Sequence, residues 1–310
     1  MAGVEIDSGL DEGLIWHFGN PVTEARALAS GEGVVDLRNR EVVEISGADR
    51  LDWLHNLTTQ HMAQLAPGEA TTALILSPTG HIEHVLHGVD DGESFLAWTE
   101  PGRAAALIEF LERMRFATRV EVARREDLRV VWAGHKVPLD PQWRVRDSDL
   151  GGVEAFVPVG AEVEPTVGTW AFDALRVAAG VPRIFVDTDH KTIPNEIGLV
   201  GTHLNKGCYR GQETVARVHT LGRPPRRLVQ LHLDGSLSQL PEVGAPLEYN
   251  GRTVGFVGTS ARHHELGPIA LALLKRNVPV DAEVLAGGIA ASQEVLVDPD
   301  VGLHVRPVLS

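Results

Sequence analysis

Short apolar runs separated by Gly, Pro and Asp recur along the chain and predict an α+β protein. Two β-rich runs, 33–37 and 41–46, flank the polar residues 38–40, and this pattern predicts a hairpin. Leucines then recur at helical spacing and predict a helix over about 48–60. Residues 1–32 are mixed and Gly-rich, and no element is predicted there.

The next part of the chain combines strand and helix patterns joined by turns that contain Pro, Gly and Asp. The expected elements are strands at 71–76, 81–89 and 94–99, a helix over about 101–116 and a strand at 119–123. Together with the helix that precedes them, these elements fit a ferredoxin-like subdomain over about 46–125.

In the C-terminal part the sequence pattern changes to short β-rich runs separated by Gly, Pro and Asn. The runs are 228–233, 246–249, 253–259, 269–274 and 283–285. Their spacing predicts a small antiparallel β-barrel. Pro224 and Pro225 mark the boundary, so we expect one domain over 1–225 and a barrel domain over 226–310. Ahead of the boundary, a helix is expected over 170–179, and residues 181–225 show little periodicity.

Charge and composition narrow the class of protein. The 310 residues include 28 Lys and Arg against 42 Asp and Glu, a formal net charge of −14. Such a field repels nucleic acid and anionic membranes over most of the surface, so we expect neither as a direct partner. The chain shows no secretory signal and no apolar run of the ~20 residues that a membrane helix needs. Motifs of P-loop, Rossmann and serine-hydrolase sites do not occur. We expect a cytoplasmic protein.

The one cysteine of the chain, Cys208, lies in an unusual context. Lys206 and Arg210 flank it, and nearby cations favour the thiolate, the form that acts as a nucleophile or soft-metal ligand. Gly207 and Gly211 allow a tight turn and close approach of a partner. The alternative is a buried cysteine that acts as a small hydrophobic residue. A single thiol forms no intrachain disulfide, which suits a reducing compartment.

Acidic and basic residues near Cys208 suggest a ligand. Glu213 and Glu196 each carry a carboxylate that can accept paired N–H groups, such as those on the edge of a pterin ring. Alternatively, each is a solvated surface acid. Arginines follow Glu213 closely and form either a local site for an anionic tail or a solvated linker. They are Arg217, Arg223, Arg226 and Arg227.

His81, His84 and His87 raise the question of a metal site. In a strand, His84 points to the opposite face from the other two, and no cysteine or pair of carboxylates completes a recognisable ligand set. We therefore expect no metal.

The eight residues around Cys208 carry a resemblance to a known family. They are Lys206, Gly207, Cys208, Tyr209, Arg210, Gly211, Gln212 and Glu213. This segment resembles the K-G-C-Y-x-G-Q-E motif of YgfZ-type folate-binding proteins, which are relatives of the glycine-cleavage aminomethyltransferases. Further similarity occurs at 33–40, 54–60, 179–183, 187–189 and 193–196, so the resemblance spans about 30–275.

The resemblance implies a cloverleaf of a split folate-binding region, a ferredoxin-like subdomain and a C-terminal antiparallel β-barrel. It implies tetrahydrofolate or a one-carbon derivative as the ligand. The folate-binding residues expected on this basis are Glu213, Glu196, Arg217, Arg223 and Tyr209. It also implies a role in assembling or maintaining iron–sulfur enzymes, with indirect effects on tRNA modification, and a functional thiol at Cys208. The expected partners are therefore folate and iron–sulfur enzymes or their assembly proteins.

One departure bears on catalysis. Aminomethyltransferases carry a catalytic aspartate after a turn that resembles residues 77–80, whereas this chain continues His81-Ile-Glu-His84. Glu83 or His84 would have to replace that aspartate, and small misplacements of a catalytic group are costly. Three hypotheses remain. The chain is an accessory factor that uses Cys208, a folate-dependent one-carbon transferase or demethylase, or a non-catalytic folate-binding module.

Overall fold

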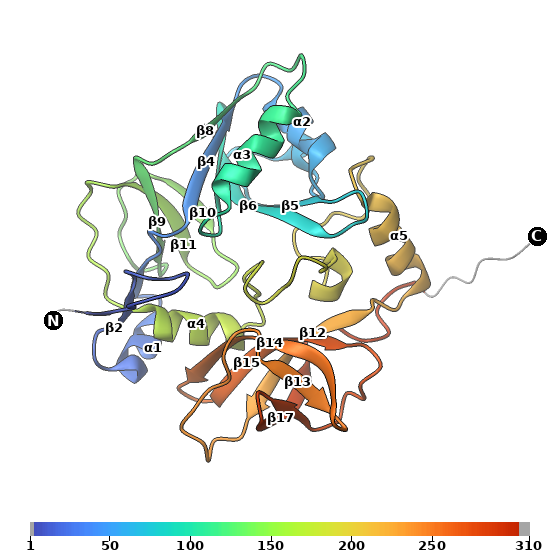
Figure 1. The fold of residues 1–310 in the computed structure, drawn as a ribbon. Helices are drawn as coiled ribbons and strands as arrows, with labels where there is room; N and C mark the ends of the chain where they lie inside the picture. Colours follow the sequence, from blue (N-terminus) through green and yellow to red (C-terminus); the bar gives the residue numbers. More distant parts are fainter. Residues whose placement is uncertain (1–2, 304–310) are drawn as a thin grey trace, which may run out of the picture. The chain divides into compact units, whose positions relative to one another are not determined.

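The computed structural model describes residues 3–303, and the chain divides into two compact units (Figure 1). Unit 1 comprises Met1–Ile75, His84–Phe172 and Gly201–Tyr209. Unit 2 comprises Leu76–Glu83, Asp173–Val200 and Arg210–Ser310. One boundary falls inside the motif, between Tyr209 and Arg210.

Unit 1 contains most of a five-stranded antiparallel sheet in the order β5-β6-β7-β4-β8. The strands are β4 (Glu41–Ser46), β5 (Ala70–Leu76), β6 (Ile82–Asp90), β7 (Ser94–Thr99) and β8 (Glu121–Arg124). Helices α2 (Arg50–Leu57) and α3 (Ala104–Arg113) follow β4 and β7, and a 3-10 turn, η1, covers Met62–Gln64. Trp53, Leu107 and Phe110 of the helices share a core with Ile45 and Phe95 of the sheet. This helix-on-sheet layer is the arrangement predicted for the ferredoxin-like part.

A second sheet of unit 1 has four strands in the order β10-β11-β9-β3. They are β3 (Val34–Asp36), β9 (Leu128–Ala133), β10 (Arg144–Asp147) and β11 (Val153–Pro158). The predicted hairpin of residues 33–46 is therefore wrong, because β3 pairs with β9 while β4 pairs with β7 and β8. An alternating pattern identifies a strand but does not choose its partner. Here β3 pairs with the longer apolar strand β9, and β4 pairs with β7 and β8, all far along the chain.

The N-terminal residues also form regular elements, which the sequence pattern did not predict. Strands β1 (Val4–Glu5) and β2 (Ile15–His17) pair with each other, and α1 covers Pro21–Ala29. The side chain of Asn20 caps α1 by accepting a hydrogen bond from the N–H of Thr23, and Pro21 occupies the first turn.

The barrel of unit 2 is closed and has six strands in the order β12-β15-β14-β13-β16-β17. They are β12 (Arg226–Leu233), β13 (Pro246–Tyr249), β14 (Arg252–His263), β15 (Gly267–Lys275), β16 (Val284–Ala286) and β17 (Ile289–Val295). The predicted antiparallel barrel is confirmed. The sequence pattern missed β17, which closes the barrel against β12. Residues Ala174 and Val177 of α4 (Thr169–Ala178) pack on the outside of this barrel with Leu228 and Leu271.

Two further elements of unit 2 lie in the stretch that showed little periodicity. The 3-10 turn η2 covers Pro194–Ile197, and helix α5 covers Gln212–Leu221. Among residues 3–303, no helix combines the length and the apolar character that crossing a membrane requires.

Candidate functional site

The second half of the motif begins helix α5 and packs against the turn at residues 77–80. Gly211 precedes the helix with φ of 80°, a left-handed conformation that favours glycine. A Cβ atom at Gly211 would lie 2.5 Å from the backbone oxygen of Ser77, and one at Gly80 would lie 2.7 Å from Cβ of Thr214. Both glycines are therefore required for this close approach. The fold thus brings together two segments that the sequence analysis treated separately.

An ion pair links the same two segments. A guanidinium nitrogen of Arg210 lies 2.9 Å from a carboxylate oxygen of Glu83, and both side chains are about one-third exposed, at 33% and 37%. Glu83 is one of the two residues considered as replacements for the missing aspartate, and its charge is already compensated by Arg210. The other, His84, belongs to unit 1, where its ring lies 5.6 Å from that of Phe110.

The first half of the motif is anchored in unit 1 at the end of α2. The buried ammonium group of Lys206 donates hydrogen bonds to the carbonyl oxygens of Thr58, at 2.6 Å, and of His55. Cations at a helix C-terminus satisfy carbonyl groups that have no partner within the helix. The ammonium group also lies 5.0 Å from the ring centroid of Tyr209. Burial lowers the pKa of Lys206 to about 8 and raises the pKa of Tyr209 to about 12.

Cys208 is exposed between these two buried anchors. Lys206 and Tyr209 fix the backbone on either side, so the thiol projects from a short segment of defined position. These contacts fix the backbone of the segment, but they do not test whether the sulfur of Cys208 is a thiolate. The two flanking cations are directed elsewhere, since Lys206 binds carbonyl oxygens and Arg210 binds Glu83. The thiolate prediction thus stays a prediction.

Three histidines lie close to the first half of the motif, and the sequence analysis did not single them out. The ring centroids of His55 and His61 are 4.6 Å apart, and those of His61 and His203 are 5.4 Å apart. Burial, followed by the charge of Lys206 and the neighbouring His61, lowers the pKa of His55. A Cβ atom at Gly207 would lie 3.9 Å from Nε2 of His55. The only sequence signal was the proximity of His203 to the motif.

Glu196 is held in a buried network of unit 2. Its carboxylate is 1% exposed and accepts two hydrogen bonds from Arg226, at 2.8 and 2.9 Å, and one from the backbone N–H of Ile193, at 3.1 Å. The same guanidinium binds Asp189 at 2.8 and 2.9 Å. Burial opposes ionisation of Asp189, but the hydrogen bonds from Arg226 and Thr192 hold its pKa well below the ordinary value.

A buried acceptor lies beside Glu196. The side-chain amide of Asn195 is buried and donates to the carbonyl oxygen of Val215 in α5 at 3.2 Å. Its oxygen, Oδ1, has no hydrogen-bond partner among residues 3–303. An unsatisfied buried acceptor is costly, so this oxygen is the one polar atom of the Asn195 side chain whose burial is not compensated.

The remaining predicted residues are dispersed. Glu213 and Arg217 are exposed on α5, and Arg223 is exposed after the helix with φ of 102°. Arg227 is fully buried and donates to the side-chain oxygen of Gln293 at 2.7 Å. The arginine patch predicted from sequence therefore does not include Arg227, which belongs to the barrel.

The histidines of β6 do not share a site. His87 is partly buried, stacks on Trp98 at 4.1 Å and lies 3.0 Å from the hydroxyl of Thr72. Burial, with the charges of Arg146 and Arg40, holds the pKa of His87 well below its ordinary value. Within the described part of the chain, no three His, Cys, Asp or Glu side chains are grouped so that they could hold a metal ion.

No protein-family model matches the chain, but individual known proteins are similar to it. A putative chloroplastic transferase of Arabidopsis thaliana, At1g60990, is 26% identical over 286 residues, which cover 79% of this chain and 65% of that protein. The tRNA-modifying protein YgfZ of Yersinia enterocolitica is 41% identical over 91 residues, 27% of either chain. The glycine cleavage system aminomethyltransferase T from Bartonella henselae superposes with a TM-score of 0.77 and 19% identity, over 97% of this chain and 95% of that one.

The chain is thus an aminomethyltransferase-fold protein, with a C-terminal six-stranded antiparallel barrel. Its relatives in sequence are YgfZ-like proteins and the plant transferase, both distant. The resemblance read from the Cys208 motif and the predicted fold class are confirmed. The alignments span just under two thirds of the plant protein and about a quarter of YgfZ.

Proposed function

We propose that this chain is a tetrahydrofolate-binding accessory factor for iron–sulfur proteins in which the thiol of Cys208 acts on a partner protein. The observation that carries the proposal is the exposure of the chain's one cysteine between two buried anchors, Lys206 and Tyr209. A reactive group that must reach a partner has to be exposed and held in place. An iron–sulfur cluster takes about four ligands, so Cys208 shares any cluster with ligands of the partner.

Within this proposal, the pterin ring of the folate binds to residues of η2. A pterin edge presents adjacent N–H donors, and Oδ1 of Asn195 is a buried acceptor without a partner among residues 3–303. The neighbouring Glu196 is oriented by two hydrogen bonds from Arg226, and each carboxylate oxygen can accept a further hydrogen bond. When bound, tetrahydrofolate supplies the carrier for a one-carbon group. Glu213, Arg217, Arg223 and Tyr209 complete the proposed set of folate-binding residues.

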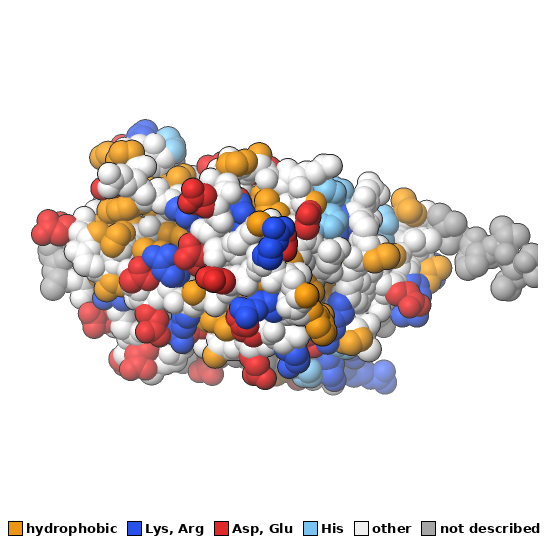
Figure 2. Space-filling view, turned by 90° about the horizontal axis from the view of Figure 1, so that it is seen from above, with side chains coloured by type: hydrophobic (Ala, Val, Ile, Leu, Met, Phe, Trp, Pro, Cys, Tyr) orange, Lys and Arg blue, Asp and Glu red, His pale blue; other side chains and the backbone are white. Residues whose placement is uncertain are grey.

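Aminomethyl transfer is less well supported than the accessory role. A catalytic base must accept a proton in the bound complex, and the aspartate that does so in aminomethyltransferases is replaced here by residues 81–84. Glu83 is paired with Arg210 at 2.9 Å, so its carboxylate is already engaged by a cation. The charge distribution also favours a protein partner over nucleic acid, since the net charge is −14 and acidic side chains are interspersed with basic ones on the face in Figure 2. Any effect on tRNA modification is then indirect, through iron–sulfur enzymes.

Calorimetric titration with tetrahydrofolate tests the ligand. We expect binding to the wild-type protein, and at least tenfold weaker binding (about 1.4 kcal/mol) to Asn195→Ala and to Glu213→Ala. Glu242→Ala, which removes an exposed carboxylate elsewhere in unit 2, is the matched control and retains wild-type affinity. A wild-type protein that binds no tetrahydrofolate overturns the folate part of the proposal.

Complementation tests the thiol. In a strain that lacks the protein, wild type restores iron–sulfur enzyme activity and Cys208→Ala does not, although the variant still binds tetrahydrofolate. Full restoration by Cys208→Ala refutes a role for the sulfur. If native Cys208 also fails to react with a thiol reagent at neutral pH, the chain is a non-catalytic folate-binding module.

A further inference from the structure

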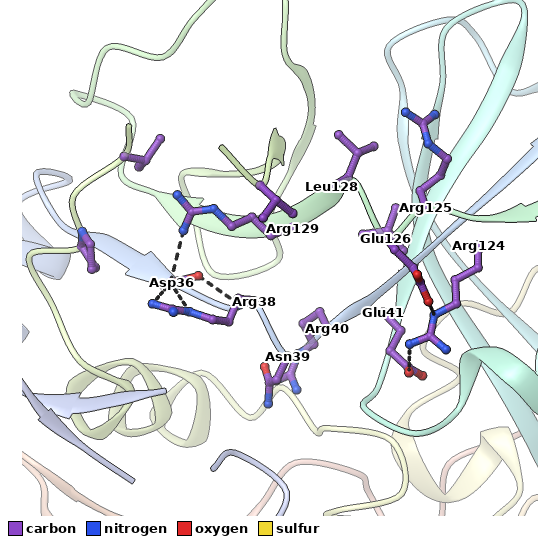
Figure 3. A pocket seen from close by; sticks show the side chains of 14 residues that line it. Asp36, Arg38, Asn39, Arg40, Glu41, Arg124, Arg125, Glu126, Leu128 and Arg129 are labelled. Atoms are coloured by element: carbon purple, nitrogen blue, oxygen red, sulfur yellow. Dashed lines mark hydrogen bonds and ion pairs between the residues drawn. The ribbon is translucent and has the colours of Figure 1, made fainter. Parts of the chain in front are cut away.

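A cavity of about 730 Å³ lies within unit 1, apart from the residues of the proposed folate site (Figure 3). Two segments that connect the two sheets of this unit form its floor. One runs from β3 to β4 (36–42) and the other from β8 to β9 (124–129). A hydrogen bond of 2.9 Å from the N–H of Arg125 to the carbonyl oxygen of Val42 fixes the segments side by side.

The lining of the cavity is basic in a protein that is acidic overall. Five arginines line it, against three acidic side chains, whereas the whole chain has a net charge of −14. Arg125 is fully committed, because its guanidinium binds Glu44 and Asp127 at 2.7 to 2.8 Å. Arg124 pairs with Glu41 at 2.8 Å at the rim of the cavity.

Positive charge is in excess only locally, at Arg38 and Arg129. Elsewhere in the lining Arg124 is shared by two carboxylates, those of Glu41 at 2.8 Å and Glu126 at 3.6 Å. Both guanidinium groups converge on the one carboxylate of Asp36, at 2.5 and 3.2 Å, and Figure 3 shows them approaching it from opposite sides. Asp36 is 2% exposed, so two cations share one buried anion and a unit of positive charge is left over. The side chain of Arg38 is 55% exposed, and Nε of Arg129 has no hydrogen-bond partner among residues 3–303. The guanidinium groups of Arg38 and Arg129 thus supply hydrogen-bond donors and positive charge to the cavity.

The lining also has an apolar part, which comes from β9 and the loop after β11. It is formed by Leu128, Val159, Val163 and Pro165. Val159 is held there by a hydrogen bond of 2.9 Å from its N–H to the carbonyl oxygen of Asp127. A cavity that is lined by both a guanidinium pair and aliphatic side chains matches a ligand that has a charged end and an apolar body.

We propose that this cavity binds a small organic anion, a carboxylate or a phosphate monoester. Its oxyanion lies on Arg38 and Arg129, and its apolar body lies against Leu128 and Val159. Planar guanidinium groups bind carboxylate and phosphate oxygens in pairs, which gives the site its preference for oxyanions. Asp36 limits the affinity, because it repels the same oxygens that the arginines attract.

Calorimetry with three probes tests the site: benzoate, phenyl phosphate and inorganic phosphate. We expect phenyl phosphate or benzoate to bind to the wild-type protein at least tenfold more tightly than inorganic phosphate. Arg38→Gln, an exposed position that leaves Arg129 paired with Asp36, weakens binding of the aromatic probe by tenfold or more (about 1.4 kcal/mol). The matched control is Arg119→Gln, which removes an arginine that is 77% exposed and lies outside the cavity in the same unit.

Each result decides the question. Failure of all three probes to bind overturns the proposal, as does an equal loss of affinity in Arg38→Gln and Arg119→Gln, which would reveal only a general effect of surface charge. Equal affinity for phenyl phosphate and inorganic phosphate overturns the apolar contact. Asp36→Asn supplies a test with the opposite sign, since we expect tighter binding once the repelling carboxylate is gone. Where that buried substitution prevents folding, the comparison of Arg38→Gln with Arg119→Gln decides alone.

Discussion

Gly211 is the point at which the motif helix meets the turn at residues 77–80, and its substitution by alanine tests that contact. Two effects add. Alanine in a left-handed conformation costs ~1–2 kcal/mol. Its Cβ would also lie 2.5 Å from the oxygen of Ser77 and 3.0 Å from Cα of Gly80, both backbone atoms that cannot rotate away. Forced overpacking of this kind costs ~1–3 kcal/mol. We therefore expect Gly211→Ala to lower the free energy of unfolding by ~2–5 kcal/mol.

Gly244 provides a control that separates the two effects. It lies in unit 2, as Gly211 does, and has φ of 84°, but a Cβ atom there would meet nothing within 4 Å. Gly244→Ala is expected to cost only the conformational part, ~1–2 kcal/mol. Urea unfolding followed by far-ultraviolet circular dichroism measures both variants. Tryptophan fluorescence is unsuitable, because all 6 tryptophans lie in unit 1. Equal destabilisation by the two substitutions would refute the close packing of Gly211 on the turn.

Two further predictions concern charged groups. Arg226→Gln leaves Glu196 buried without its cation and is expected to destabilise the protein by ~3–5 kcal/mol. Arg226 also holds the folded-state pKa of Asp189 below the unfolded value. The stability that comes from the Asp189 pair is therefore present above about pH 4 and is lost as the pH falls further, so the difference in stability between wild type and Arg226→Gln should shrink in acid. Burial lowers the pKa of Lys206 from 10.5 to about 8 in the folded protein. Between these two pH values the unfolded chain binds more protons than the folded protein does. The free energy of unfolding of the wild-type protein should therefore rise with pH across this window. Urea midpoints measured from pH 7 to pH 10.5 should show this rise in wild type and not in Lys206→Met.

The fold was largely predictable from local patterns, and the errors have physical causes. Strands and helices with strong periodicity, such as β7 and α3, were predicted close to their observed bounds. Strand β17 was missed because its exposed face is polar and its sequence, Ile289–Val295, resembles a loop. The hairpin at 33–46 was wrong because strand partners are chosen by burial across long sequence distances.

The site was predictable only where its residues are adjacent in sequence. The motif around Cys208 is continuous and was identified directly. The anchoring of Lys206 on His55 joins residues 151 positions apart, and no local pattern predicts it. The same holds for the unsatisfied oxygen of Asn195, which depends on how η2 packs against α5. Sequence adjacency therefore located the Cys208 segment, while the residues that anchor it could be identified only in the folded chain.

Because Cys208 is the one cysteine of the chain and is exposed, each molecule can form a single intermolecular disulfide bond. Oxidation can link two copies through Cys208, but neither copy then has a thiol left to bind a third. Covalent assemblies therefore stop at a dimer, or at a one-to-one adduct with whichever partner thiol meets Cys208 first. A mixed disulfide trapped in cells would report its partner without ambiguity, because every cross-link on this chain has the same attachment point.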